Sequence, residues 1–392
     1  MREQASAVDV GRLWRLAQES LKSDQRPGAD DLHVEGINRL AQAMGRRAEG
    51  DAAARRVARR DVYAWIASYL SFVRDLDLHP EIAAVPIERP VFIAGLGRTG
   101  STLLHNLLAL APQARAPRLW EILTPSPPLM EGASAAPRIA IARQRLALLT
   151  AAAPQVLSIH PMDPEAPDEC HWMMRHGPLW AVFYDVPDYW AWLKSLSVDQ
   201  LRTLYAHYRL QVQHLLLAKR GFWVSKAFSH LHFLPVLYDV FPDARVVRLH
   251  RDPTAAIPSL CSLARAYRSI FSTRVDPRAI GAGILDLFLD GMARAMALDR
   301  ARPEAPVVDV HFAELVADPI GTVRRVLGQL GYPCDAGAER AMQAYLEKAA
   351  AAPAYQHRYS LEEFGLDRAE VLDRSAEYLA WAEARCGRSL LA

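Results

Sequence analysis

The sequence predicts an α/β fold: a parallel sheet flanked by helices, with an N-terminal helical extension. Two observations lead to this prediction. Short apolar runs alternate with segments of helical periodicity, and a glycine-rich loop joins the first apolar run to a helix. Strands that alternate with helices form parallel sheets, because each crossover between parallel strands needs a long connection, usually a helix.

The composition points to a globular protein without an overall charge bias. The chain has 392 residues, of which 51% are hydrophobic and 23% charged, and its formal net charge is +2. This balance argues against nucleic acid or a membrane as an electrostatic partner, so we expect a small-molecule partner held by local charges. The apolar stretches are too short for a membrane span, and the first ten residues lack a signal-peptide core, so we expect a cytoplasmic protein.

Metal binding is not expected from the sequence. His171 and His176 are five residues apart, which does not place them on one helix face, and no HExxH motif occurs. The four cysteines are isolated, without a CxxC pair, which argues against a zinc ribbon or a disulfide framework: Cys170, Cys261, Cys334 and Cys386.

Residues 1–85 are predicted to form a helical region, packed on an α/β domain of residues 86–392. Apolar residues recur at helical spacing: Leu13, Leu16, Ala17 and Leu21, then Val62, Trp65, Ile66 and Leu70. This region contains no phosphate-binding or nucleophile motif. A cap over an acceptor site and a dimer surface are open alternatives for it.

The first strand of the sheet is expected at residues 90–94, followed by a loop at 95–100 and a helix at 101–110. Further buried strands are expected at 222–225, 245–249 and 307–312, with helices at 199–218 and 319–330. The last helix has Asp318 as its expected N-cap and Gly331 after its end.

Two segments lack periodicity and are expected to be irregular. Residues 112–137 are rich in Pro, Ala and Ser. Residues 160–192 contain four tryptophans among prolines, which predicts an apolar pocket wall or a second hydrophobic cluster with equal weight.

The loop after the first strand is close to a phosphate-binding P-loop, GxxxxGK[ST]. The glycine spacing is kept from Gly95 to Gly100 and Thr102 fills the Ser/Thr position, but Ser101 replaces the lysine and a basic residue appears earlier, as Arg98. Backbone N–H groups and a helix N-terminus can still bind an anion. The parts that hold Mg²⁺ and a γ-phosphate are missing.

Basic residues also follow two later strands. Lys226 follows the second strand, and Arg251 ends the third, before Asp252 and Pro253 as N-cap and first helical residue. Ligands of open parallel sheets bind beyond the carboxyl ends of the strands, so we expect Arg98, Lys226 and Arg251 at one edge.

Together these residues resemble the family of PAPS-dependent sulfotransferases, most of all its bacterial branch, which is related to the tyrosylprotein sulfotransferases. The resemblance covers roughly residues 85–380. The family's 5′-phosphosulfate loop matches Arg98, Thr99, Gly100, Ser101 and Thr102; its 3′-phosphate motif matches Arg251 and Ser259; and its catalytic lysine matches Lys226. The blocks 117–121, 160–170 and 357–365, the last with His357 and Tyr359, also resemble the bacterial branch.

The resemblance implies a donor, PAPS, with PAP as product, and sulfuryl transfer to a hydroxyl of a small acceptor: an alcohol, a phenol or a sugar. It implies that Arg98 and Lys226 act at the bridging oxygen, and that Tyr359 lies at the nucleotide. Three features depart from the family pattern, the least important being Ala227 and Phe228 after Lys226 in place of the more familiar Ser-Pro. Pro258 interrupts the helix before Ser259, and Phe228 stands where cytosolic members carry a histidine.

The acceptor hydroxyl needs a general base. Glu121 lies at a spacing similar to the glutamate of the tyrosylprotein enzymes and ranks first, ahead of His230 and Glu169. A P-loop kinase and a non-catalytic nucleotide-binding protein are the alternatives to a sulfotransferase. The sequence lacks the loop lysine and the metal-binding Asp that a kinase needs. The presence of Lys226 together with both phosphate motifs argues against a non-catalytic nucleotide-binding protein.

Overall fold

The computed structural model describes residues 8–25, 28, 31–130, 132–174, 178–272, 275–351 and 359–391. His176 and His357 lie outside the described residues.

Five parallel strands form one sheet in the order β2-β3-β1-β4-β5. Four of them match the expected strands: β1 (Val91–Gly95), β3 (Phe222–Lys226), β4 (Arg245–His250) and β5 (Val307–His311). The fifth, β2 (Ala114–Arg115), falls in a segment that was expected to be irregular, and it pairs with the start of β3. Two residues carry no alternation pattern, so this edge strand gave no signal in the sequence.

The sheet separates two hydrophobic cores. Alternate side chains of β1 point to opposite faces, so Val91 and Ile93 join one core while Phe92 and Ala94 join the other. The smaller core is covered by α4 (Ser101–Leu108), α15 (Phe312–Ala317), α16 (Pro319–Leu330) and α17 (Ala336–Ala350). The larger core is covered mainly by α11 (Val198–Ala218), α12 (Leu234–Val240), α13 (Pro253–Phe271) and α14 (Pro277–Ala301). The predicted α/β sheet flanked by helices is thereby confirmed.

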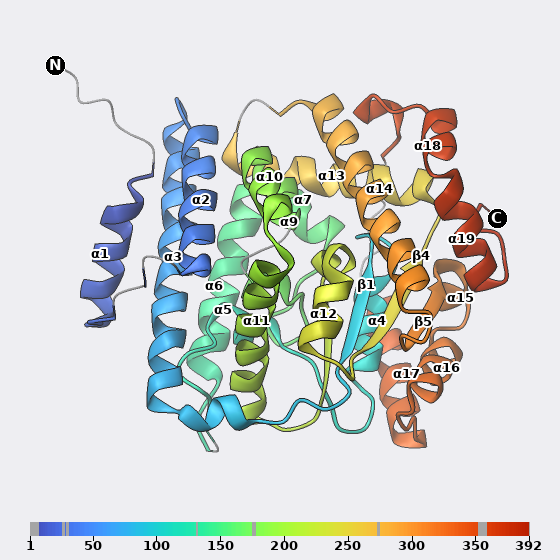
Figure 1. The fold of residues 1–392 in the computed structure, drawn as a ribbon, viewed down its shortest axis with the longest axis horizontal. Helices are drawn as coiled ribbons and strands as arrows, with labels where there is room; N and C mark the ends of the chain where they lie inside the picture. Colours follow the sequence, from blue (N-terminus) through green and yellow to red (C-terminus); the bar gives the residue numbers. More distant parts are fainter. Residues whose placement is uncertain are drawn as a thin grey trace.

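The N-terminal region is helical, as expected. Its elements are α1 (Val10–Leu21), α2 (Leu32–Arg47), α3 (Ala52–Leu78) and the short 3₁₀ helix η1 (Pro80–Ala84). An aspartate caps the start of each α-helix: Asp9, Asp31 and Asp51. Helices α1–α3 lie at the opposite end of the molecule from α16 and α17 (Figure 1). Their buried side chains join the same core as those of β1, and the division into domains at residue 85 stays a prediction.

Helices of 4 to 17 residues occupy the two segments that lack periodicity, the stretch between them and the connection after β3. They are α5 (Leu119–Leu123), α6 (Ala136–Ala152), α7 (Pro154–Ile159), α8 (His171–Met174), α9 (Pro178–Tyr184) and α10 (Pro187–Ser195), with the 3₁₀ helix η2 (Phe228–Phe233) after β3. Proline occupies the first turn of α6, α7 and α10, where it needs no hydrogen-bond partner. Apart from α6, which has 17 residues, these helices have at most nine residues, which is too short for a clear helical periodicity.

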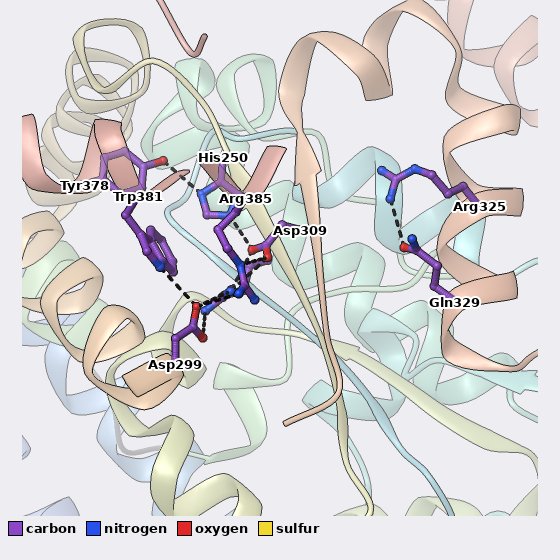
Figure 2. A network of polar contacts seen from close by, with 9 residues as sticks. His250, Asp299, Asp309, Arg325, Gln329, Tyr378, Trp381 and Arg385 are labelled. Atoms are coloured by element: carbon purple, nitrogen blue, oxygen red, sulfur yellow. Dashed lines mark hydrogen bonds and ion pairs between the residues drawn. The ribbon is translucent and has the colours of Figure 1, made fainter. Parts of the chain in front are cut away.

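The C-terminal part ends with η3 (Glu362–Phe364), α18 (Arg368–Arg374) and α19 (Ala376–Cys386). A polar network fastens α19 to β4 and β5 (Figure 2). Arg248 of β4 is 1% exposed and binds the carboxylates of Asp299 and Asp309. Its guanidinium carbon lies 4.6 Å from the ring centre of Trp381. Arg385 of α19 also binds Asp309. A buried cation is tolerated here because two carboxylates and an aromatic face surround it.

Within the residues that the structure describes, no helix has the length and apolar character that crossing a membrane requires.

Candidate active site

The loop between β1 and α4 depends on a glycine at position 100. Gly100 has a φ of +86°, and a Cβ atom there would lie 3.1 Å from Leu315 and 3.2 Å from Phe312. Arg98 also has a positive φ, of +73°. Gly100 is the N-cap of α4, and no side chain caps this helix, so its positive N-terminal end stays available to an anion. The loop is therefore shaped by backbone, as the sequence predicts.

Arg98 and Arg251 come together at the carboxyl end of the sheet. The Nε of Arg98 donates a hydrogen bond to the Oγ of Ser259 at 3.0 Å, and the Nη1 of Arg251 donates to the carbonyl of Arg98 at 2.6 Å. The guanidinium of Arg251 also lies over the ring of Phe312, 4.1 Å from its centre. Two cations and a buried hydroxyl thus surround one side of the loop.

Helix α13 positions Ser259 in spite of Pro258. The helix runs unbroken from Pro253 to Phe271, with Asp252 as its N-cap and Pro253 as its first residue, as expected. Pro258 lies inside it, and the Ser259 side chain that follows is fully buried and faces Arg98. The proline therefore does not displace Ser259 from the loop.

Lys226, the last residue of β3, lies on the other side of the loop. Its Nζ donates a hydrogen bond to the Oγ1 of Thr102 at 3.0 Å and is 2.7 Å from the Oε1 of Glu169. The backbone N–H of Cys170 binds the carbonyl of Lys226 at 3.0 Å, which holds the segment that carries Glu169 at the end of β3. The expected cluster of three cations at one sheet edge is present, and it includes a carboxylate.

The Glu169 carboxylate is shared between Lys226 and His171. Its Oε2 is 3.0 Å from the Nδ1 of His171. Burial alone would raise the pKa of Glu169, but the charge of Lys226 and the contact with His171 lower it well below the ordinary value. The pKa of nearby His160 is lowered to about 3, by burial first and then by the charge of Lys226. A carboxylate ion and a neutral imidazole therefore lie in this site at neutral pH.

A pocket of about 230 Å³ opens between these groups. Its polar wall includes Arg98, Ser101, Thr102, Glu169 and Arg251. Its apolar wall comes from α8, α9, η2, α13 and α15, through Trp172, Phe183, Phe228, Leu260, Leu263, Tyr267 and Phe312. Of the two readings of the tryptophan-rich segment, the pocket wall holds for Trp172, whereas Trp180 is buried in the larger core.

The structure does not bring Glu121 to this pocket. Its carboxylate binds Arg115 through two hydrogen bonds of 2.6 and 2.9 Å, and it accepts a third from the backbone N–H of Arg118. Arg115 is 4% exposed, so Glu121 neutralises a buried cation at the start of α5. The spacing along the chain that favoured Glu121 as the base does not correspond to proximity in space.

His230 is also separated from the pocket. It is fully buried in η2 between two partners, with Cys170 Sγ 3.2 Å from its Nε2 and the Tyr205 hydroxyl 3.1 Å from its Nδ1. Burial lowers its pKa to about 3. Of the three expected bases, only Glu169 faces the pocket.

Tyr359 lies near Arg98 and is half-buried. Burial lowers the pKa of Arg98, and the positive charge of Arg251 lowers it further. The phenol of Tyr359 acts in the opposite direction and raises the pKa of Arg98. Tyr359 does not line the pocket itself, so its place at a nucleotide stays a prediction.

Two histidines of the site were not among the predicted site residues. His160 and His171 both line the pocket, one at each end of the segment that supplies Glu169. The available signal was the position of His171, two residues after Glu169, whereas its spacing from His176 indicated only that the two do not form a metal pair.

Known proteins are similar to this chain in sequence and in fold. A model described as "Sulfotransferase family" matches residues 90–336. Curated relatives from Mycobacterium bovis and Mycobacterium tuberculosis, each named omega-hydroxy-beta-dihydromenaquinone-9 sulfotransferase, are 27% identical over 261 residues. That match covers 62% of this chain and 62% of the length of those relatives.

Solved structures match over nearly the whole chain. Sulfotransferase STF1 from Mycobacterium tuberculosis H37Rv is 27% identical with a TM-score of 0.79, and the match covers 96% of this chain and 100% of that one. Sulfotransferase STF9 from Mycobacterium avium is 24% identical with a TM-score of 0.82 and 97% coverage of both chains, and it supports the fold. Since the family model spans more than half of the sequence and includes the loop, Lys226 and Arg251, the chain belongs to the sulfotransferase family.

Proposed function

We propose that the protein transfers a sulfuryl group from PAPS to a hydroxyl of an apolar small molecule. The observation that supports this most is a single pocket in which a phosphate-type loop and Glu169, which is paired with Lys226, face an apolar wall. The anion-binding groups and the apolar side chains suit the two different substrates.

The donor is assigned to the loop side of the pocket. The N-terminus of α4, with Ser101 and Thr102, would bind the 5′-phosphosulfate, because an uncapped helix start favours anions. Arg251 and Ser259 would bind the 3′-phosphate, with Arg98 between the two anions through its contacts to both residues. A second phosphate site is what PAPS needs and AMP does not.

The transfer itself depends on electrostatics and alignment. During the reaction the acceptor oxygen forms a bond to sulfur, while the bond between sulfur and the bridging oxygen of the donor breaks and PAP leaves. Negative charge grows on the bridging oxygen, as in phosphoryl transfer. Lys226 and Arg98 are the cations that would stabilise it.

Glu169 is the general base of this proposal. It would take the proton of the acceptor hydroxyl, with His171 as a positioning residue that holds the second carboxylate oxygen. In the structure Lys226 pairs with this carboxylate. When Lys226 turns towards the donor, Glu169 loses its strongest attraction and its proton affinity rises, which suits a base.

The acceptor is assigned by the apolar wall. Trp172, Phe183, Phe228 and Tyr267 offer large hydrophobic surfaces, which fit a lipophilic alcohol better than a sugar. The mycobacterial relatives are named for a hydroxylated menaquinone derivative, which is also lipophilic. We therefore favour an alcohol on an apolar chain among the alternatives that the sequence left open.

Calorimetry with adenosine 3′,5′-bisphosphate tests the donor assignment. We expect binding much tighter than that of AMP, and the difference should shrink in Arg251→Ala, because this change removes one ligand of the second phosphate. Mg-ATP should bind weakly. Equal affinities for the bisphosphate and AMP would refute the 3′-phosphate site, and tight Mg-ATP binding would favour a kinase.

Turnover of radiolabelled PAPS with short-chain primary alcohols tests the acceptor assignment. We expect sulfated alcohol as product, with turnover that persists in EDTA, since the one carboxylate of the described pocket lining is already paired with Lys226. Absence of turnover with every alcohol and phenol tried, together with bisphosphate binding, would favour the non-catalytic alternative.

A further inference from the structure

Tyr267 of α13 contributes a polar atom to the pocket as well as an apolar ring. The ring stacks on that of Phe183, with centres 4.1 Å apart and planes inclined by 20°. Within the residues that the structure describes, the hydroxyl of Tyr267 forms no hydrogen bond, although the residue is only 6% exposed. The hydroxyl of Tyr238, which also lacks a partner, is enclosed in the interior, whereas that of Tyr267 is not. Because buried polar groups are normally hydrogen-bonded, this hydroxyl is available to a ligand of the pocket.

Helix α13 places Tyr267 at the end of the pocket that we assign to the acceptor substrate. Leu260, Leu263 and Tyr267 line the pocket from one face of the helix, at positions i, i+3 and i+7. Ser259, which is assigned to the donor, precedes Tyr267 by eight positions, which corresponds to about 12 Å along the helix axis. Phe183, the stacking partner of Tyr267, belongs to the apolar wall. One helix therefore reaches from the donor end of the pocket to the acceptor end.

The hydroxyl of Tyr267 also lies close enough to the proposed base to feel its charge. Burial raises the pKa of Tyr267, and the negative charges of Asp168 and Glu169 raise it further, so the phenol keeps its proton at neutral pH. The carboxylate of Glu169 binds Lys226 and His171 but not Tyr267, although Tyr267 and Glu169 both line the pocket. An oxygen atom between them can accept a hydrogen bond from the phenol and donate one to the carboxylate.

Contacts between α13 and α9 hold the tyrosine ring in place. Arg268, the next residue, donates a hydrogen bond from its Nε to the carbonyl of Val182 at 2.7 Å, and its Nη1 is 2.8 Å from the Oδ1 of Asp185. These bonds join α13 to both sides of the segment that carries Phe183, which restrains the stacked pair. A hydroxyl on a ring that is already restrained loses little rotational freedom when it binds a ligand.

We propose that Tyr267 binds the acceptor substrate: its hydroxyl donates a hydrogen bond to the substrate oxygen, while Glu169 takes the proton of that oxygen. This role rests on the proposed function. One lone pair of the substrate oxygen faces Tyr267, and another forms the bond to sulfur as the bridging oxygen leaves with PAP. The proton passes to Glu169, and Tyr267 keeps its own. The arrangement selects a neutral hydroxyl, because an ammonium group has no lone pair for Tyr267.

Tyr267→Phe tests this role, because it removes only the hydroxyl and keeps the ring on Phe183. With a short primary alcohol we expect kcat/KM to fall roughly three- to tenfold, the effect of one neutral hydrogen bond. The Kd for adenosine 3′,5′-bisphosphate should stay unchanged, because Tyr267 is placed at the other end of the pocket. Thermal unfolding checks that the variant is folded.

A comparison of two ligands separates a lost hydrogen bond from a distorted wall. Binding of a 1-alkanol and of the 1-fluoroalkane of equal length is measured by calorimetry in the presence of adenosine 3′,5′-bisphosphate. The two chains have the same apolar part, but the fluoroalkane lacks the hydroxyl. We expect the wild type to prefer the alcohol, and Tyr267→Phe to reduce this preference roughly three- to tenfold. A distorted wall would weaken both ligands alike, so an unchanged preference would contradict the proposed hydrogen bond.

The matched control is Tyr184→Phe, on α9 beside Phe183. The hydroxyl of Tyr184 binds Asp61 at 3.0 Å, and Tyr184 is not part of the described pocket lining. Its removal should lower thermal stability and leave both kcat/KM and the preference for the alcohol unchanged. Equal losses of preference in the two variants, or no loss in Tyr267→Phe, would overturn the role of Tyr267, while sulfation of alcohols by the wild type would uphold the proposed function. A wild type that binds the bisphosphate but sulfates no alcohol would refute the proposed function, and the role of Tyr267 with it.

Discussion

The Nζ of Lys226 lies 2.7 Å from the Oε1 of Glu169, with side chains that are 4% and 16% exposed. This pair joins the residue assigned to the leaving group with the residue assigned to the acceptor. Before the donor binds, the lysine suppresses the basicity of the carboxylate. Donor binding that attracts Lys226 would release Glu169, so that the base becomes effective only when the donor is present.

Glu169→Gln tests the base. We expect kcat to fall by ~10²–10⁴-fold, the range for loss of a general base, while the Kd for adenosine 3′,5′-bisphosphate stays nearly unchanged. Lys226→Ala should lower kcat and also weaken the nucleotide. Steady-state kinetics and calorimetry on both variants check this, and near-normal turnover of Glu169→Gln would exclude it as the base.

Glu121→Gln should affect stability rather than catalysis. The change leaves the buried Arg115 without its carboxylate, and breaking such a pair costs about 3–5 kcal/mol in the free energy of unfolding. Denaturant unfolding and kcat per folded enzyme separate the two effects. A strong loss of kcat in a variant of normal stability would restore Glu121 as the base.

The pH dependence of kcat/KM separates Glu169 from His171. The pKa of Glu169 is lowered well below 4.5 in the free enzyme, so the carboxylate is ionised and active from pH 8 down to about pH 5. A base loses activity as pH falls through its pKa. We expect a flat profile between pH 8 and about pH 5, and an acid limb in this range that His171→Gln removes would assign the base to the histidine.

Gly100→Ala should weaken both the fold and nucleotide binding. The backbone at position 100 has a positive φ, which strains any residue other than glycine, and a Cβ atom there would meet Phe312 and Leu315. We therefore expect a loss of about 1–3 kcal/mol in stability and weaker bisphosphate binding. Gly50→Ala is the matched control, since Gly50 has a φ of +79° and nothing within 4 Å of its would-be Cβ. Equal effects of the two changes would show that contact with Phe312 is unimportant.

Asp309→Asn should destabilise the protein through Arg248. Burial tends to raise the pKa of Asp309, but His250 and Arg248 lower it far below 3.8. The contribution of the ionised carboxylate to the free energy of unfolding is therefore complete above pH 3.8 and is lost as the pH falls below this value. We expect a loss of about 3–5 kcal/mol that is constant from pH 7 to 5 and shrinks in acid. Asp286→Asn, at an exposed pair with Arg374, should cost less than about 1 kcal/mol, and a similar loss in both would contradict the prediction.

The sequence predicted those parts of the site that depend on local pattern. The loop and Arg251 follow buried strands and Lys226 ends one, and parallel strands bring their carboxyl ends to one edge. The position of Glu121 could not be predicted, because it is turned towards Arg115 of β2, and a strand of two residues has no recognisable pattern.

Glu169 and His171 were harder to rank for a different reason. They occur in a segment without periodicity, and only tertiary contacts place it. The backbone bond from Cys170 to Lys226 sets its position at the end of β3. Spacing along a chain says little about such a contact, because the two residues are 56 positions apart.

Phe312 has a consequence for the order in which the protein is made. It packs against Gly100 and carries the guanidinium of Arg251 on its ring, yet it follows the last strand of the sheet. The residues that it supports are synthesised some 60 to 210 positions earlier. A ribosome-bound chain that stops short of Phe312 lacks this support, so the proposed nucleotide site would be complete only late in translation.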